Sequence, residues 1–160
     1  MSSHVTVLYA TVSGNAEALA AAVVTQLRAA GQTAEALNMA DYPPARLAEE
    51  RTVLIIASTW GEGALPPDAE AFCAALAGHA PLPRLRYAVL ALGSRAYGDF
   101  CGGGRRIDEA LEKCGATRLR PRVECDTKYK ADFDRWLAAV LEVLPPGSVS
   151  GERPLRGQKL

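Results

Sequence analysis

TVLIIAS at residues 52–58 and RYAVLALG at residues 86–93 are the two stretches that decide the fold class of this chain. Both are almost continuously hydrophobic. Strands with this pattern are covered on both faces, as in a parallel sheet that carries helices on either side. We therefore place both stretches at the centre of such a sheet.

Short strands and amphipathic helices alternate along the rest of the chain. Leu19, Val23 and Leu27 recur at helical spacing in an Ala-rich segment that begins at Asn15 and stops at Gly31. The pattern also predicts strands over 5–10 and 33–38, and helices over 44–50, 68–77, 104–113 and 131–144.

The last predicted strand, RLRPRVEC, covers residues 118–125 and contains Pro121. Proline cannot donate a hydrogen bond to a neighbouring strand, so this strand belongs at the edge of the sheet. Five strand-helix units with right-handed crossovers predict a three-layer α/β sandwich. Its five-stranded parallel sheet has the order 2-1-3-4-5, with helices on both faces.

Length, charge and cysteine usage limit the possible classes of protein. The 160 residues suffice for one domain, which we place at residues 1–144, followed by a Pro-rich tail or linker at 145–160. Eighteen basic and eighteen acidic residues cancel, so nothing in the overall charge attracts nucleic acid or a membrane. The four cysteines contain no C-x-x-C pair, and no metal-ligand spacing is present.

The N-terminal segment lacks the pattern of a secretory signal, and no apolar stretch approaches the roughly 18 residues that span a bilayer. We therefore expect a cytoplasmic monomer with free thiols that binds neither nucleic acid nor membranes.

The residues with functional potential follow the predicted strands, at the edge where such sheets bind ligands. TVSGNAE at residues 11–17 joins two hydroxyls and a glycine to the start of a helix, whose free N–H groups favour a phosphate. The alternative is an ordinary helix cap made by Thr11 or Ser13.

Aromatic residues stand in the two other loops at this edge. Trp60 lies in STWGEGALP (residues 58–66) and Tyr97 in LGSRAYGDFC (residues 92–101). Two aromatic side chains on neighbouring loops could hold one planar ring between them, although either could also simply pack within its own loop. The P-loop motif is absent, and Pro66 replaces the third glycine of a dinucleotide fingerprint.

These three loops resemble those of flavodoxins, and especially the FMN domain of diflavin reductases such as the sulfite reductase flavoprotein. The resemblance spans residues 5–144 and implies a flavodoxin-like fold of the short-chain type that binds FMN. It implies that Trp60 and Tyr97 pack on the two faces of the flavin, that Gly61 faces flavin N(5), and that the first loop holds the phosphate. The cofactor-binding residues that it implies are Thr11, Val12, Ser13, Gly14, Asn15, Ala16, Ser58, Thr59, Trp60, Gly61, Glu62, Gly63, Leu92, Gly93, Ser94, Arg95, Tyr97, Asp99, Phe100 and Cys101.

The chain departs from its relatives at one position of the third loop. Many members read G-D-S-x-Y where this chain reads GSRAY at residues 93–97, so that Ser94 replaces a carboxylate and Arg95 stands beside it. A positive charge next to the flavin would favour its fully reduced, negatively charged form.

The resemblance implies a carrier of single electrons between an NAD(P)H-dependent flavin reductase and an acceptor redox enzyme. Two alternatives remain open: an FMN-dependent quinone or nitro reductase, and a non-redox phosphate-binding module. Turnover with NAD(P)H alone would favour the first alternative, and failure to take up flavin would favour the second.

Overall fold

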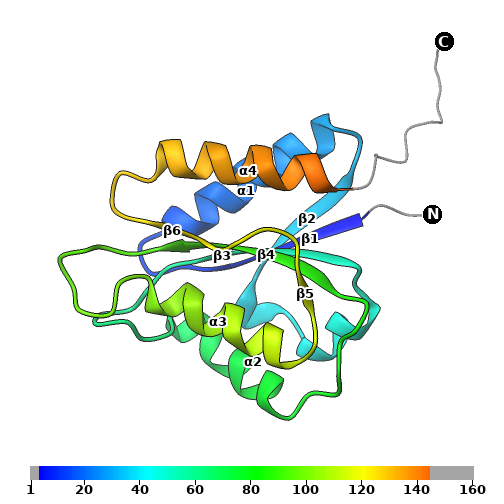
Figure 1. Cartoon of the computed structure of the whole chain (residues 1–160), viewed down its shortest axis with the longest axis horizontal. Helices are drawn as coiled ribbons and strands as arrows, with labels where there is room; N and C mark the ends of the chain where they lie inside the picture. The colour runs from blue at the N-terminus through cyan, green and yellow to red at the C-terminus, as the bar shows by residue number, and fades with distance from the viewer. Residues whose placement is uncertain (1–3, 145–160) are drawn as a thin grey trace.

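Six parallel strands form the central layer of the computed structural model, which describes residues 4–144 (Figure 1). The main path of the sheet has the order β2-β1-β3-β4-β5, and β6 also pairs with β4. The strands are β1 (His4–Ala10), β2 (Thr33–Asn38), β3 (Thr52–Ala57), β4 (Arg86–Leu92), β5 (Thr117–Arg118) and β6 (Val123–Cys125). The predicted fold class, strand order and central position of the two apolar runs are confirmed.

Helices cover both faces of this sheet. Helices α1 (Asn15–Ala29) and α4 (Lys130–Val143) lie on the face that is uppermost in Figure 1, and α2 (Pro67–Ala77) and α3 (Gly102–Lys113) lie on the opposite face. The 3-10 segments η1 (Met39–Asp41) and η2 (Pro44–Glu49) follow β2. Alternate residues of β3 point to opposite faces: Leu54 and Ile56 join one buried core, and Val53 and Ile55 join the other.

Glycine and proline mark several helix ends. Gly14 precedes α1 and Gly31 follows it, both with a positive φ, at 94° and 88°, which glycine adopts without steric cost. Pro67 opens α2, where its missing N–H is not needed. These boundaries agree with the predicted ones to within a few residues.

The last predicted strand is wrong as a single element: the structure divides it into β5 and β6, with Pro121 between them. Both pieces pair with β4 at the edge of the sheet, as the proline predicted. The carboxylate of Asp108 in α3 accepts hydrogen bonds from Arg118, at the end of β5, and from Arg122, just before β6. Two causes therefore maintain the interruption: Pro121, which cannot donate a hydrogen bond to β4, and the ion pairs of both arginines with the buried Asp108.

Two helices also differ from their predictions. The segment predicted as a helix over 44–50 is the 3-10 helix η2. Helix α3 begins at Gly102 rather than at Gly104, because its first three residues are glycines that pack closely against β4 and against the loop that follows β3. The predicted tail at 145–160 lies outside the described residues.

All four cysteines are free thiols. Within residues 4–144, no group of three or more His, Cys, Asp or Glu side chains is placed to hold a metal ion. None of the helices in that range has both the length and the apolar character that crossing a membrane requires.

Candidate cofactor site

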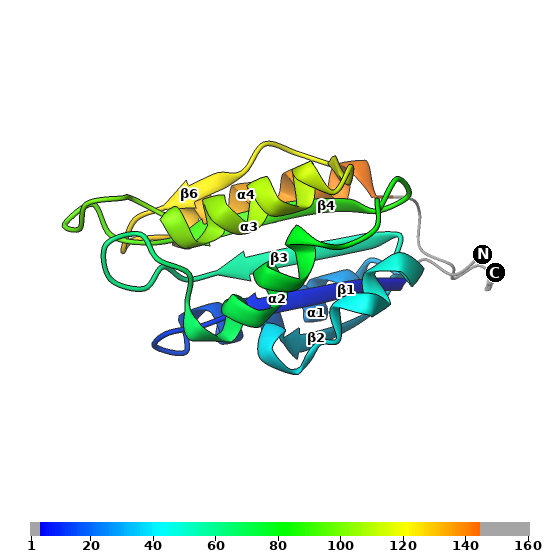
Figure 2. The same ribbon diagram turned by 90° about the horizontal axis from the view of Figure 1, so that it is seen from below.

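The carboxyl ends of β1, β3, β4 and β6 meet at one edge of the sheet, at the left in Figure 2. The loops that leave these strands enclose a cavity of about 540 Å³, a size typical of small-molecule sites. Its lining consists of Val12, Ser13, Asn15, Ser58, Thr59, Trp60, Gly61, Leu92, Gly93, Ser94, Tyr97, Asp99, Cys101, Asp126, Thr127 and Tyr129.

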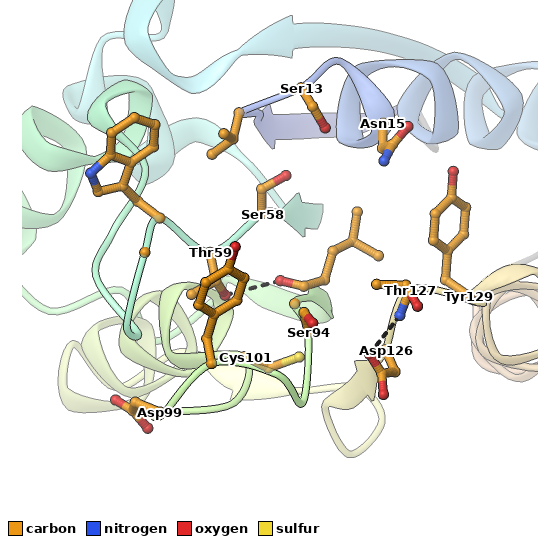
Figure 3. A pocket seen from close by; sticks show the side chains of 16 residues that line it. Ser13, Asn15, Ser58, Thr59, Ser94, Asp99, Cys101, Asp126, Thr127 and Tyr129 are labelled. Carbon is orange, nitrogen blue, oxygen red and sulfur yellow. Dashed lines mark hydrogen bonds between the residues drawn. The ribbon is translucent and has the colours of Figure 1, made fainter.

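Two hydrogen bonds fix Thr11, the first residue of the first loop. The Thr11 hydroxyl accepts a hydrogen bond from the backbone N–H of Gly14 at 2.8 Å, and the N–H of Thr11 donates to Asp68 at 3.2 Å. Among the described residues, no side chain caps α1, so the helix-cap alternative is not what the structure shows. The N–H groups of its first turn are available to a ligand. Ser13 and Asn15 lie on the α1 side of the cavity (Figure 3).

Thr59, which follows β3, forms hydrogen bonds with β4 and with α3. Its hydroxyl donates to the carbonyl of Leu92 at 2.9 Å and accepts from the N–H of Gly103 at 3.1 Å (Figure 3 shows the first bond). A Cβ on Gly103 would lie only 2.3 Å from the Ser58 carbonyl oxygen. Glycine is therefore required where α3 approaches this loop.

The two predicted aromatic residues stand at the mouth of the cavity. Trp60 is 52% exposed and Tyr97 is 55% exposed, and both line the cavity. With Val12, they are the large hydrophobic residues that the described part of the chain exposes. A buried position within its own loop, the alternative reading for either aromatic, is not observed.

The Trp60 side chain is carried by a tight turn that comprises residues 60–64. The backbones of Trp60 and Ala64 exchange two hydrogen bonds of 2.9 Å, and Gly61 and Gly63 both have a positive φ. Apart from Gly61 itself and its two chain neighbours, no atom of the described residues lies within 4 Å of where a Cβ on Gly61 would stand, so the strain of a substitution there comes from backbone conformation rather than from crowding.

Cys101 is the last residue of the third loop and directly precedes α3. It has a left-handed conformation, with φ at 56°. Burial is the main cause that raises the pKa of its thiol to about 12. The side chain therefore stays neutral at physiological pH and adds no charge to the wall of the cavity.

The predicted residues divide into two groups. Most of them line the cavity, and the remainder do not: Thr11, Gly14, Ala16, Glu62, Gly63, Arg95 and Phe100. Glu62 accepts a hydrogen bond from the N–H of Gly98 at 2.7 Å and thereby links the second loop to the third.

Sequence reasoning missed the fourth wall, formed by Asp126, Thr127 and Tyr129. These residues follow β6 and lie on the α4 side of the cavity (Figure 3). The available signal was their position at the carboxyl end of the last strand, the same criterion that selected the other three loops.

Arg95 is not among the residues that line the cavity, and its ion-pair partner is Asp126, which is. Its guanidinium is 3.7 Å from Asp126 and lies over the ring of Phe100, and its side chain is 71% exposed. Arg95 therefore does not line the cavity in this structure. Arg95 instead compensates the charge of Asp126, which itself lines the cavity.

With the FMN that the resemblance of the loops implies in the cavity, Arg95→Ala is expected to lower the potential of its second one-electron reduction, because the variant leaves Asp126 uncompensated beside a cofactor that gains negative charge. The shift should stay below about 59 mV, the value of a tenfold change for one electron, since the ion pair is exposed. Arg95→Ala combined with Asp126→Asn should return the potential toward its original value. Spectroelectrochemical titration measures both, and an unchanged second potential in Arg95→Ala would contradict the assignment.

The comparisons with known proteins agree with this fold. A family model described as Flavodoxin matches residues 7–136, and the chain belongs to the flavodoxin family. As a member of this family, it is an FMN-binding protein of electron transfer.

Its relatives include long proteins and small ones. It is 41% identical over 146 residues to the sulfite reductase [NADPH] flavoprotein alpha-component of Bacillus subtilis, covering 90% of this chain and 24% of that protein. The same protein of Vibrio cholerae is 39% identical over 145 residues, with 89% and 24% covered. The chain thus spans about a quarter of the length of these curated relatives.

Solved flavodoxins match over nearly their whole length. A short-chain flavodoxin associated with a non-canonical PDU bacterial microcompartment is 26% identical, with a TM-score of 0.79, covering 89% of this chain and 97% of that one. A mutant of the flavodoxin from Pseudomonas aeruginosa is 28% identical, with a TM-score of 0.78, covering 88% and 98%.

The residues present fit FMN. Hydroxyl and amide side chains together with the uncapped start of α1 offer donors for a phosphate, and none of the residues between 4 and 144 that line the cavity is basic. Two half-exposed aromatic side chains at the mouth suit a flat ring. Neutral donors would therefore carry the phosphate, as the loop sequence predicts.

Proposed function

We propose that this chain passes single electrons from an NAD(P)H-dependent flavin reductase to a separate redox enzyme through bound FMN. The observation that carries the proposal is the cavity that opens to the surface between Trp60 and Tyr97, both half exposed. A cofactor in such a cavity is accessible to a docked protein. FMN supplies the redox chemistry, and the protein binds it, orients it and tunes its electronics.

We assign the roles of the lining residues as follows. Ser13, Asn15 and the first-turn N–H groups of α1 hold the phosphate, and Ser58 and Thr59 lie beside it. Trp60 and Tyr97 pack on the two faces of the ring system. The loop at residues 92–101 borders its polar edge, chiefly through backbone groups. The resemblance of the three loops and the lining of the cavity support this assignment.

Residues 1–144 form the FMN-binding unit in this proposal, and residues 145–160 a linker or tail. The relatives of greater length are described as NADPH flavoproteins, which supports a donor that draws its electrons from NAD(P)H. The test is uptake of one FMN per chain, followed by electron flow from a flavin reductase and NADPH through the chain to cytochrome c as a one-electron acceptor. Failure of FMN uptake overturns the proposal.

The second candidate is an FMN-dependent quinone or nitro reductase, which uses the same cofactor and needs space for a substrate above it. The loaded protein with NADPH and a quinone, but without any reductase, decides between the two. We expect no turnover above the rate of free FMN. Turnover in that mixture would establish the enzyme instead of the carrier.

Electron transfer to a partner is expected to depend weakly on salt, with less than about a threefold change in rate between low and high ionic strength. The carboxylates near the site are already engaged: Glu62 accepts from Gly98, Asp68 from Thr11, and Asp99 from Arg105. Stopped-flow rates across a salt series measure the effect. A steep fall with salt would reveal a concentrated acidic docking face.

A further inference from the structure

The 60–64 turn is held from outside the cavity by Arg106 of α3 and by the segment that leads into this helix. Arg106 donates from Nε to the carbonyl oxygen of Gly63 at 2.9 Å. On the other side of the turn, Glu62 accepts a hydrogen bond from the N–H of Gly98 at 2.7 Å. Neither Arg106 nor Glu62 lines the cavity, so these contacts act on the turn and not directly on a ligand.

Asp99 contacts the two arginines near the start of α3. Both of its carboxylate oxygens accept from Nη2 of Arg105 at 2.6 Å, and Oδ2 is 3.5 Å from Nη2 of Arg106. The hydrogen bond from Arg105 is the main cause that lowers the pKa of Asp99 below its ordinary value. The carboxylate is therefore charged at physiological pH and faces both arginines.

The backbone approach between the two segments requires glycine on both sides. A Cβ on Gly63 would lie 2.2 Å from the Cβ of Asp99, and a Cβ on Gly102 would lie 2.4 Å from the carbonyl oxygen of Gly63. Any side chain at either position would separate the segments. The contact of Arg106 with the Gly63 carbonyl thus belongs to a close, shape-dependent junction.

The turn has conformational freedom that this junction restricts. Gly61 and Gly63 both occupy a left-handed conformation, and glycine exchanges such a conformation for others at little cost. Gly61 lines the cavity, so the orientation of its peptide decides whether a carbonyl or an N–H faces a bound ligand. A carbonyl favours a protonated or positively charged ligand atom, whereas an N–H favours an unprotonated or negatively charged one.

We propose that Arg106 is a positioning residue of this electron carrier: by holding the Gly63 carbonyl, it restricts the 60–64 turn and thereby sets the spacing between the two one-electron potentials. The inference rests on the proposed function for its redox consequence. Its structural half, the restraint of the turn, concerns this chain alone. A restrained turn reorients at higher free-energy cost when the cofactor takes up its first electron. The potential of the first one-electron reduction therefore stays closer to that of the second.

The restraint is tested without cofactor. In apoprotein carrying Arg106→Gln, amide hydrogen exchange at Ala64 and Gly98, whose N–H groups are bonded across the turn, should accelerate about two- to tenfold, the effect of one ordinary hydrogen bond. The matched control is Arg105→Gln, which removes an adjacent positive charge and a bond to Asp99 but leaves the Gly63 contact in place. It should leave exchange at Ala64 unchanged.

The redox consequence is tested with FMN bound. Arg106→Gln should raise the first potential relative to the second, by a factor of about two to ten in the corresponding equilibrium constant. Arg106→Lys, which keeps the charge but lacks Nε, should behave like Arg106→Gln. Arg105→Gln should change the spacing less than either. Thermal unfolding of each variant confirms folding, since Arg106 is half exposed on α3.

Three results would overturn the inference. Equal shifts in Arg105→Gln and Arg106→Gln, or wild-type behaviour of Arg106→Lys, would show that charge and not the contact with Gly63 is responsible. Unchanged exchange at Ala64 in Arg106→Gln would show that the turn is not restrained by this residue. If the wild-type chain takes up no FMN, the proposed function fails, while exchange in the apoprotein still decides whether Arg106 restrains the turn.

Discussion

Replacing Asp108 with alanine is expected to lower the free energy of unfolding by about 3–5 kcal/mol, because it leaves two arginines and a tyrosine hydroxyl without their shared acceptor. Asp108 is completely buried. It accepts from Arg118 at 2.8 Å, from Arg122 at 2.6 Å and from the Tyr87 hydroxyl at 2.6 Å. Burial, followed by the bond to Asp108, raises the pKa of Tyr87, so this hydroxyl remains a donor at any physiological pH.

The cluster also connects stability to the site. Arg118 ends β5 and Arg122 precedes β6, so losing their common partner loosens the strand that leads to Asp126, Thr127 and Tyr129. We therefore expect weaker FMN binding in Asp108→Ala as well as a lower urea midpoint. Urea unfolding followed by circular dichroism gives the free energy, on the two-state assumption that suits a domain of this size.

Asp134→Asn is the matched control. Its carboxylate pairs with Lys130 one helical turn away on the exposed face of α4, and such pairs contribute about 0.3–0.5 kcal/mol. A loss below about 1 kcal/mol in Asp108→Ala would mean that the two arginines, which also pair with Glu112 and Glu124, replace the lost acceptor without cost, contrary to the expected penalty for removing one partner of a buried ion pair.

Gly103→Ala is expected to lower the free energy of unfolding by about 1–3 kcal/mol and to weaken FMN binding about tenfold or more. The added methyl would lie 2.3 Å from the Ser58 carbonyl oxygen and 3.1 Å from Cα of Thr59, so backbone must move to admit it. That movement separates α3 from the loop after β3 and breaks the bond from the Gly103 N–H to the Thr59 hydroxyl. Urea unfolding and fluorescence titration with FMN measure the two effects.

The sign of this prediction is informative, because alanine favours a helix over glycine by about 1 kcal/mol where nothing obstructs it. Gly78→Ala is the control: no atom lies within 4 Å of its added Cβ, and its φ is −112°, which alanine adopts freely. It should leave stability unchanged or raise it by about 0.4–1 kcal/mol. A stabilised Gly103→Ala would contradict the close packing that we attribute to this helix start.

The loops that carry the site could be recognised from residue types in sequence order. Trp60 and Tyr97 each follow a strand whose apolar run marks it as central, and TVSGNAE at residues 11–17 has the composition of an anion-binding helix start. What remained invisible was the support around them. Arg105 and Arg106 are two unremarkable helix residues in sequence, and only the fold brings them to Asp99 and Gly63.

The run of glycines at residues 102–104 shows the same limit. Glycine lowers helix propensity, so the pattern predicts a later start for α3, whereas tertiary contacts with Ser58 and Ala91 leave no room for any other residue. Propensity is a local quantity of fractions of a kcal/mol per residue, and a backbone clash outweighs it.

By itself, the sequence determined the class of sheet, its strand order, the family and the three principal loops of the site, because each depends on local hydrophobic pattern or on motifs of adjacent residues. The tertiary structure alone decided that the last strand is split into two pieces whose arginines bind Asp108 of α3. It also decided that Asp126, Thr127 and Tyr129 complete the cavity and that Arg95 faces Asp126. These features depend on which side chains of distant segments meet. Electrostatic and steric pairing over such separations leaves no periodic signal in a single sequence.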